Sequence, residues 1–225
     1  MNSGKTDTFE SFEESPPRIS EWQRFWRIFL QRKIVLFGLV VLALLVISAI
    51  FAEFLAPYDP YVNNMKESLQ QPSSAHLLGT DLHGRDTLSR LIFGARTALL
   101  VGFVTTLIAA VSGTILGIIA GFFGGVPGAI IMRFMDALMG FPMLLLALIL
   151  SAVLGGGIQN VILALGVAMV PGYCRVMNGM TLSLKENDYV LAEKSMGANN
   201  WRIMLRHILP NSLAPILVLS TAQLG

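Results

Sequence analysis

A polar segment near the C-terminus, residues 188–210, reads DYVLAEKSMGANNWRIMLRHILP and lies between two apolar stretches. Gly197 can adopt the left-handed conformation that ends a helix, because it has no Cβ atom. Asn199 or Asn200 can cap the helix that follows. The segment therefore predicts two short helices that meet at Gly197.

The second of these helices is predicted to be amphipathic. Its apolar residues recur at i, i+3, i+4 and i+7, namely Trp201, Met204, Leu205 and Ile208. Arg202 and Arg206 stand one turn apart on the other face. Pro210 lacks an amide hydrogen and disfavours helical geometry at Leu209, so we expect it to end the helix. A folded knob of this shape is suited to docking at a membrane surface.

The composition is that of an integral membrane protein. Hydrophobic residues make up 54% of the chain and charged residues 13%, and the mean hydropathy is +0.65. One crossing needs roughly 20 apolar residues. The runs without charge are 34–52, 97–132, 137–174 and 208–225. Glycine-rich turns at 124–128 and 155–157 divide them further. The prediction is an all-α, polytopic membrane protein with helices near 34–55, 97–122, 129–153, 158–177 and from 212 onward.

The last of these helices is expected to be incomplete. Too few residues follow Pro210 to cross a hydrocarbon core of roughly 30 Å at about 1.5 Å per residue. We therefore expect the working protein to continue beyond Gly225.

Basic residues predict that the N-terminus and the knob are both cytoplasmic. Those preceding the first span include Arg18, Arg24, Arg27, Arg32 and Lys33, and those between the fourth and fifth spans are Arg175, Lys185, Lys194, Arg202 and Arg206. The expected organisation is a cytoplasmic tail at 1–33, a first transmembrane helix at 34–55, an extracytoplasmic loop at 56–96 and a core domain at 97–225. That core contains a cytoplasmic loop at 178–211.

Several kinds of chemistry are not expected. Cys174 is the one cysteine, so the chain has no internal disulfide and no cysteine metal cluster. The net charge of +2 does not indicate a nucleic-acid partner. Gly4 and Lys5 lack the rest of a phosphate-binding loop, so ATP is not expected to bind this chain. The three histidines have no ligand spacing. We expect neither catalytic residues nor a metal or other cofactor here.

Arg133 and Asp136 are charged residues at membrane depth in the third predicted span. Their i, i+3 spacing predicts an ion pair, which spares each partner from facing lipid alone. The pair can be a proton relay or gate, but a structural pair at the membrane boundary is the favoured interpretation. Phe141-Pro142 is expected to kink the same helix.

Gly113, Gly117 and Gly121 form a stripe of small residues along the second predicted span. Such a stripe lets another helix approach closely, so it is expected to face protein and not lipid. The spacing leaves open whether the partner helix belongs to this chain or to another subunit.

Two motifs resemble a known family, the membrane subunits (permeases) of ABC importers. Ala192, Gly197 and Leu209-Pro210 are similar to the cytoplasmic loop of these permeases. The flanking residues resemble the peptide-transporting subgroup: Asp188-Tyr189-Val190, Gly197-Ala198 and Arg206-His207-Ile208-Leu209-Pro210-Asn211. The upstream motif is similar to the C-type subunit of dipeptide and oligopeptide permeases: His76-Leu77-Leu78-Gly79-Thr80-Asp81, Gly84-Arg85-Asp86, Ser89-Arg90 and Gly94-Ala95-Arg96. The resemblance covers about residues 20–225.

The resemblance implies a type I importer permease with a sixth helix beyond Gly225, in a bacterial inner membrane. It implies a second, homologous permease subunit, two cytoplasmic ATPase subunits that bind ATP and Mg²⁺, and an extracytoplasmic solute-binding protein. It also implies that the knob couples to an ATPase. The coupling residues would be Asp188, Tyr189, Ala192, Glu193, Met196, Gly197, Ala198, Arg202, Arg206 and Pro210.

Alternatives remain at this stage. Short peptides are the first solute class, but relatives of this kind also carry nickel chelates, glutathione or sugars. A gradient-driven secondary transporter that uses Arg133 and Asp136 is the alternative from another class. A membrane enzyme lacks a set of catalytic residues.

Overall fold

The computed structural model describes residues 32–224, which form helices and loops and one isolated β-bridge between Thr80 and Asp86. The predicted cytoplasmic tail lies almost wholly in residues 1–31, outside the described residues. The helices are α2 (Lys33–Ile50), α3 (Ala52–Leu55), the 3₁₀ turn η1 (Met65–Glu67), α4 (Thr87–Phe123), α5 (Gly125–Met139), α6 (Met143–Leu154), α7 (Ile158–Leu184), α8 (Asp188–Ser195), α9 (Asn200–Ile203), the π-helical turn η2 (Met204–Ile208) and α10 (Leu209–Leu224). The all-α prediction is confirmed.

The chain divides into two units, Met1–Ile47 and Ser48–Gly225. The described part of the first unit is the beginning of α2, which is apolar on all sides, as a helix surrounded by lipid should be. The predicted helix at 34–55 is interrupted at Phe51, where α2 gives way to the short helix α3.

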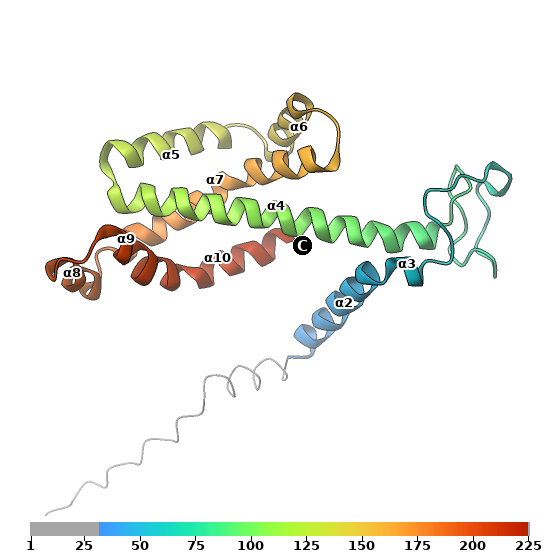
Figure 1. Cartoon of the computed structure of the whole chain (residues 1–225), viewed down its shortest axis with the longest axis horizontal. Coiled ribbons are helices and arrows are strands. Elements are labelled where there is room, and N and C mark those ends of the chain that lie inside the picture. The colour runs from blue at the N-terminus through green and yellow to red at the C-terminus, as the bar shows by residue number, and fades with distance from the viewer. Residues whose placement is uncertain (1–31, 225) are drawn as a thin grey trace, which may run out of the picture. The chain divides into compact units, whose positions relative to one another are not determined.

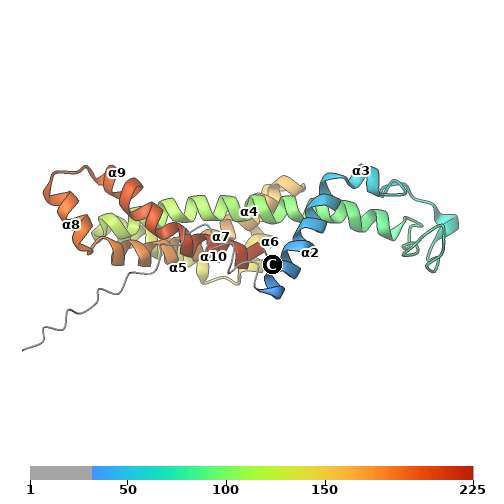
Figure 2. The same cartoon turned by 90° about the horizontal axis from the view of Figure 1, so that it is seen from below.

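The second unit is built around the parallel pair α4 and α7, which run side by side in the same direction (Figures 1 and 2). Helix α10 lies against both, α5 also contacts both, and α6 packs on α7. The largest buried cluster joins Ile118 of α4, Tyr173 and Met177 of α7, and Ile216 of α10. Helix α4 begins ten residues earlier than predicted, because Asp86 caps it at Thr87.

The glycine stripe of α4 faces α7, so its partner helix belongs to this chain. A Cβ atom on Gly113 would lie 2.5 Å from Tyr173 Cβ, and one on Gly121 would lie 2.7 Å from Thr181 Cβ. Real side chains essentially never approach so closely, and the two backbones are therefore in contact along three turns. The prediction that the stripe faces protein is confirmed.

The third predicted span, 129–153, is broken into α5 and α6, whose axes differ by 94°. The break falls at Phe141 and Pro142, as the expected kink did, but it is much larger than a kink. Pro142 has φ −54° and ψ 130°, which turns the chain out of helical geometry before α6 begins. The described residues contain four helices long and apolar enough to span a membrane, or five if α5 and α6 count as one span.

The loop before α4 folds onto the first turn of that helix. Asp86 is 3% exposed, and its Oδ2 accepts hydrogen bonds of 2.8 Å from both the backbone N–H and the hydroxyl of Ser89. Its Oδ1 lies 2.9 Å from Nδ1 of the buried His76. The Ser89 hydroxyl also accepts from the Tyr58 amide at 3.1 Å. Residues from three parts of the loop thus meet at one capping carboxylate.

The electrostatics of the loop favour ionised carboxylates. Burial opposes the charge on Asp86, but the Ser89 amide, His76 and the Ser89 hydroxyl outweigh it and lower the pKa of Asp86. Desolvation also opposes ionisation of Asp81. Hydrogen bonds from the backbone and side chain of Arg85 and from the His83 amide nevertheless hold the pKa of Asp81 far below its ordinary value.

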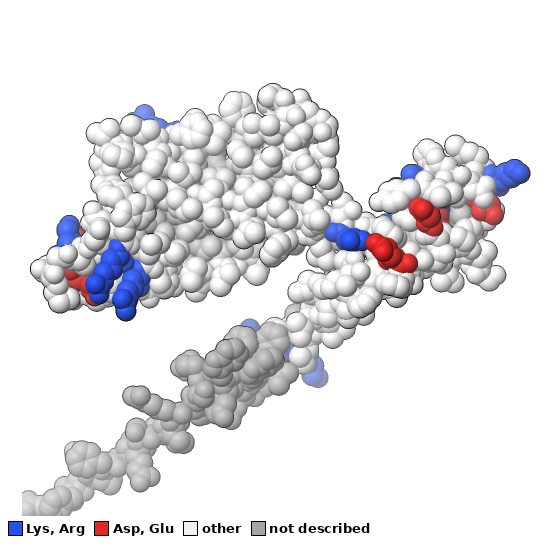
Figure 3. Space-filling view, in the orientation of Figure 1, with Lys and Arg blue, Asp and Glu red and all other residues white. Residues whose placement is uncertain are grey.

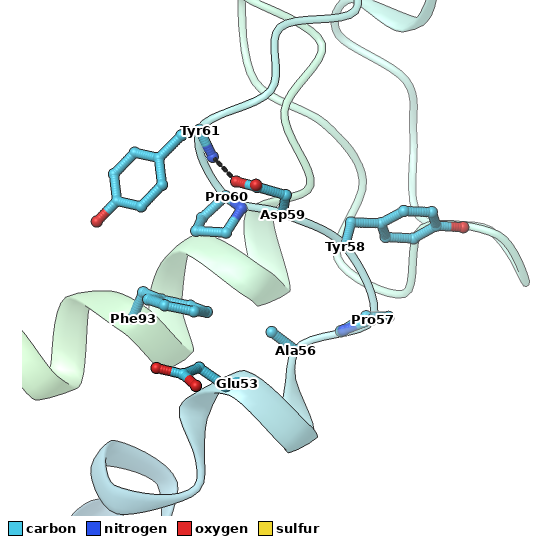
Figure 4. Close-up of a pocket in the computed structure, with 8 residues that line it drawn as sticks. All are labelled: Glu53, Ala56, Pro57, Tyr58, Asp59, Pro60, Tyr61 and Phe93. Carbon is cyan, nitrogen blue, oxygen red and sulfur yellow. Dashed lines mark hydrogen bonds between the residues drawn. The ribbon is translucent and has the colours of Figure 1, made fainter.

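An open pocket of about 380 Å³ lies between α3, the start of the loop and α4 (Figure 4). Asp59 Oδ1 accepts a 2.8 Å hydrogen bond from the Tyr61 amide in a tight turn beside it. The ring of Tyr61 meets that of Phe93 edge-on at 6.2 Å. The loop is thus fixed to α4 on two sides, by the Asp86 cap and by this aromatic contact.

We expect Gly117→Ala to destabilise the protein. The new Cβ would lie 2.6 Å from both the Cys174 carbonyl oxygen and Met177 Cβ, and overpacking of this kind costs about 1–3 kcal/mol. The thermal unfolding midpoint of the purified protein measures the effect. Gly94→Ala on the same helix is the control, because its Cβ would meet nothing within 4 Å. Equal midpoints for the two variants would contradict the close helix contact.

We expect Asp86→Asn to remove a pH-dependent part of the stability. Because the folded pKa of Asp86 is lowered, its carboxylate stabilises the fold above the unfolded value of about 4 and loses that effect as the pH falls through the folded pKa. The difference in unfolding midpoint between wild type and variant should therefore be largest near neutral pH and should disappear at acidic pH. Asp59→Asn, in the same loop, is the control. A gap that does not change with pH would refute this role of Asp86.

Candidate functional site

The knob, residues 188–210, begins with α8, which ends as predicted at Gly197. Gly197 has φ +82°. Its amide donates to the Lys194 carbonyl at 3.0 Å, and the Ala198 amide donates to the Glu193 carbonyl at 3.1 Å. This pair of bonds is the Schellman motif, in which the left-handed residue satisfies the last carbonyls of the helix. The predicted elbow is confirmed.

The next helix begins at Asn199, whose side chain accepts a 3.3 Å hydrogen bond from the Trp201 amide. Of the two predicted caps, Asn199 is therefore the one used. The prediction that Pro210 ends this helix is wrong. The chain passes through the π-helical turn η2, in which the Leu209 amide donates to the Met204 carbonyl, and continues as α10. The wider turn accommodates a proline, which lacks a donor and crowds the carbonyl four residues before it.

The same π turn changes which residues are buried. Ile203, Met204 and Ile208 are each at most 1% exposed, which corresponds to positions i, i+1 and i+5 of a widened turn. Trp201 and Leu205 are 60% and 58% exposed. The apolar residues predicted to share one face of the helix are therefore divided, with Met204 and Ile208 buried and Trp201 and Leu205 exposed.

The buried face anchors the knob in the membrane core. Val190 of α8 joins Ile203, Met204 and Ile208 in the same cluster as Tyr173 and Met177 of α7. Interiors of this density have low compressibility and transmit displacement. The knob is therefore positioned to move with α7 and α10 as one body.

The outer face of the knob combines apolar and basic side chains. Exposed there are Tyr189, Ala192, Met196, Trp201 and Leu205, together with Lys194, Arg202 and Arg206. Figure 3 shows blue Lys and Arg atoms gathered at this end of the molecule, whereas the helical body beside it is almost without charge. Large exposed apolar side chains rimmed by charge are typical of a protein-docking surface.

Inside the elbow, a polar contact links the two short helices. Glu193 Oε1 lies 3.4 Å from His207 Nε2, and the rings of Tyr189 and His207 are 6.2 Å apart. Asp188, the first residue of α8, is exposed, as is Pro210. The structure thus brings all ten predicted coupling residues into one knob, in α8, in the elbow at Gly197 and in the continuous helical segment formed by α9, η2 and the start of α10.

The predicted ion pair between Arg133 and Asp136 is wrong. Asp136 pairs instead with Arg175 of α7. Met135 packs against Val170 and Cys174, and this contact brings the next residue of each helix together. Among the described residues, Arg133 forms no ion pair. The gradient-driven alternative depends on that predicted pair.

Sequence reasoning misses several residues. It counts Arg175 only among the basic residues that set the orientation, because sequence spacing cannot show a partner 39 positions away. It includes His76, Asp86 and Ser89 in a motif but assigns them no role. A signal is present for Asp86, since Asp directly before a long, mainly apolar run is a typical residue to cap the start of a helix.

Two family comparisons match the chain. Residues 113–225 match "Binding-protein-dependent transport system inner membrane component", and residues 20–72 match "N-terminal TM domain of oligopeptide transport permease C". The first match covers the glycine stripe, the broken helix and the knob. The second covers α2, α3 and part of the outer loop.

Curated relatives agree with these matches. The chain is 42% identical over 205 residues to the glutathione transport system permease protein GsiD of Pectobacterium atrosepticum, covering 91% of this chain and 68% of the relative. It is 37% identical over 213 residues to the dipeptide transport system permease protein DppC of Alkalihalophilus pseudofirmus, covering 95% and 70%. The resemblance deduced from the two motifs is confirmed. The chain belongs to the family of inner membrane components of binding-protein-dependent transport systems, as an ABC importer permease of the oligopeptide and dipeptide type.

Proposed function

We propose that this chain forms half of the membrane pathway of an importer for short peptides and that its knob couples the pathway to a cytoplasmic ATPase. A second permease subunit completes the pathway, and a second ATPase serves that subunit. ATP and Mg²⁺ bind to the ATPases and not to this chain. An extracytoplasmic binding protein delivers the solute from the other side. The N-terminus and the knob are then cytoplasmic.

The observation that carries this proposal is the two-sided character of the knob. Val190, Ile203, Met204 and Ile208 fasten it to α7, while Tyr189, Met196 and Trp201 stand exposed. An ATPase that grips the exposed face and closes on ATP would move α7 and α10 as a rigid body. Exposure of a tryptophan and a methionine on the knob is the pattern expected of a surface that a partner protein covers.

Short peptides are the solute class that the relatives support. One relative is named for dipeptide transport and another for glutathione transport. Glutathione is itself a tripeptide derivative, so both names describe a short peptide with free amino and carboxylate groups. Nickel chelates and sugars have no counterpart among these names.

Isolation of the intact complex tests the proposal. The tagged protein is extracted gently from its native membrane, its partners are identified by mass spectrometry, and vanadate-sensitive ATP hydrolysis is measured. We expect a second permease and P-loop ATPases with activity. A stable oligomer of this chain alone, without ATPase activity, would contradict the proposal.

Gly197→Val should abolish uptake while membrane insertion is retained. The positive φ of Gly197 is strained for a β-branched residue by about 1–2 kcal/mol, which bends the elbow out of position. Gly197→Asn is the matched control, because asparagine tolerates this conformation and a Cβ here meets nothing within 4 Å. Uptake of labelled dipeptide and the abundance of the protein in membranes are measured together. Normal uptake by the valine variant would contradict coupling through this elbow.

Trp201→Ser combined with Leu205→Ser should weaken ATPase attachment. Both side chains are exposed, so the fold should keep its stability, whereas truncation of an anchoring tryptophan typically costs 2 kcal/mol or more, about 30-fold in affinity. The ATPase recovered per tagged permease measures the effect. Leu82→Ser, equally exposed in the outer loop, should change nothing. Full ATPase recovery with the double variant would place the docking face elsewhere.

A further inference from the structure

The ion pair between Asp136 and Arg175 lies at membrane depth and is not buried. Both residues fall inside candidate membrane spans, Asp136 in the bent pair α5 and α6 and Arg175 in α7. Lys185, ten residues beyond Arg175 and about 15 Å farther along the helix axis, donates to the Gly121 carbonyl near the end of α4. The two side chains are 51% and 52% exposed. Charged side chains at such depth are costly to expose to lipid and face water-filled cavities or other protein. The open side of this pair therefore belongs to the inside of the assembly.

A cavity of about 270 Å³ begins two residues after Asp136 on α5 and three residues before Arg175 on α7, at Leu138 and Gly172. It is lined by the elbow between α5 and α6, by α7 and by α10: Leu138, Met139, Phe141, Met143, Leu146, Ala168, Met169, Pro171, Gly172 and Gln223. Helix α5 runs away from the knob end of the bundle and α7 runs back toward it. These residues of α5 and α7 therefore lie farther from the knob than Asp136 and Arg175 do. The pair stands between the cavity and the cytoplasmic knob.

The lining suits ligands of variable shape. Met139, Met143 and Met169 are flexible side chains that repack around different partners, and Gln223 adds one polar group. Gly172 lies one turn before Arg175, and a Cβ atom placed on it would meet nothing within 4 Å, so the approach to Arg175 is open. An apolar cavity that accepts varied side chains is thus followed, toward the knob, by the cation Arg175 and the anion Asp136.

We propose that Asp136 and Arg175 form a charge-balanced gate in the solute pathway. A zwitterionic solute opens the gate by replacing the single ion pair within the protein with two ion pairs between protein and solute. The ammonium group of the solute binds Asp136 and its carboxylate binds Arg175. This inference rests on the proposed function, because it assumes that the cavity belongs to a peptide pathway. It adds a source of selectivity within the membrane, separate from the binding protein.

The physical reason is charge compensation. A zwitterion leaves no protein charge unpaired when the gate opens. A solute with one charge pairs with either Asp136 or Arg175 and leaves the other side chain charged, unpaired and poorly solvated. Such an unpaired charge has a high free energy. The gate therefore discriminates against peptides capped at either end, while the side chains between the termini meet the adaptable methionines.

Transport by the intact complex in proteoliposomes tests the gate, with the binding protein added. The probes are alanylalanine, its N-acetyl derivative, which is an anion, and its amide, which is a cation. In Asp136→Asn the uptake of the anion relative to the zwitterion should rise by roughly tenfold. This factor lies between the effects of removing one partner from an exposed and from a buried ion pair. In Arg175→Gln the relative uptake of the cation should rise instead. Because the same binding protein serves every variant, changes between variants report on the permease.

Arg133→Gln is the matched control, because Arg133 is an exposed arginine on the same helix, three residues from Asp136. It should leave both uptake ratios unchanged. Uptake ratios that do not change in Asp136→Asn and Arg175→Gln would overturn the gate. Should either single variant fail to assemble, Asp136→Asn combined with Arg175→Gln takes its place. Restored transport in that double variant with wild-type discrimination against both capped peptides would make the pair purely structural and overturn the gate.

The outcomes separate this inference from the proposed function. ATP-driven uptake of alanylalanine by the wild-type complex tests the importer, and the variant ratios test the gate. An importer whose variants keep wild-type ratios retains its function and loses the gate. A complex without ATP-driven peptide uptake overturns both.

Discussion

The close contact between α4 and α7 is the constraint on which the rest of the second unit depends. Gly113, Gly117 and Gly121 bring the two backbones together, and no larger residue fits at these positions. In lipid, helix association depends on packing of this kind, because apolar side chains gain little by leaving an apolar solvent. The contact fixes the direction of α7, and α7 carries both the knob and Arg175.

The outer loop and the knob lie at opposite ends of this helix pair. The outer loop is fastened to the first turn of α4 by Asp86, His76 and Ser89. The knob is fastened to the last turns of α7 by Val190, Ile203 and Met204. A single long helix, α4, therefore has a folded loop at its beginning and lies beside the knob at its end (Figures 1 and 2). A displacement of the loop or of the knob can therefore be transmitted along α4 as a rigid-body movement.

Breaks in regular helix geometry mark the functional places. The chain turns by 94° at Phe141 and Pro142 beside the cavity, and it widens into a π turn at Met204–Ile208 inside the knob. Regular helices would have continued through both places. A lipid-facing break would leave backbone groups unsatisfied, so such breaks are tolerated where protein or water surrounds them. The break at Phe141 and Pro142 is therefore expected to face protein or water, and the π turn is covered by protein at Met204 and Ile208.

The sequence by itself determined the all-α membrane class, the Gly197 elbow, an asparagine cap at Asn199 or Asn200, and the protein-facing glycine stripe. Each of these depends on local backbone chemistry or on helical spacing, which a sequence displays directly. The tertiary structure alone decided the partner of Asp136, the burial of Met204 beside an exposed Leu205, and the passage of the helix through Pro210. The first depends on contact between α5 and α7, since Met135 packs against Val170 and Cys174. The other two depend on a π turn, which rotates every later side chain away from the position that a period of 3.6 residues predicts.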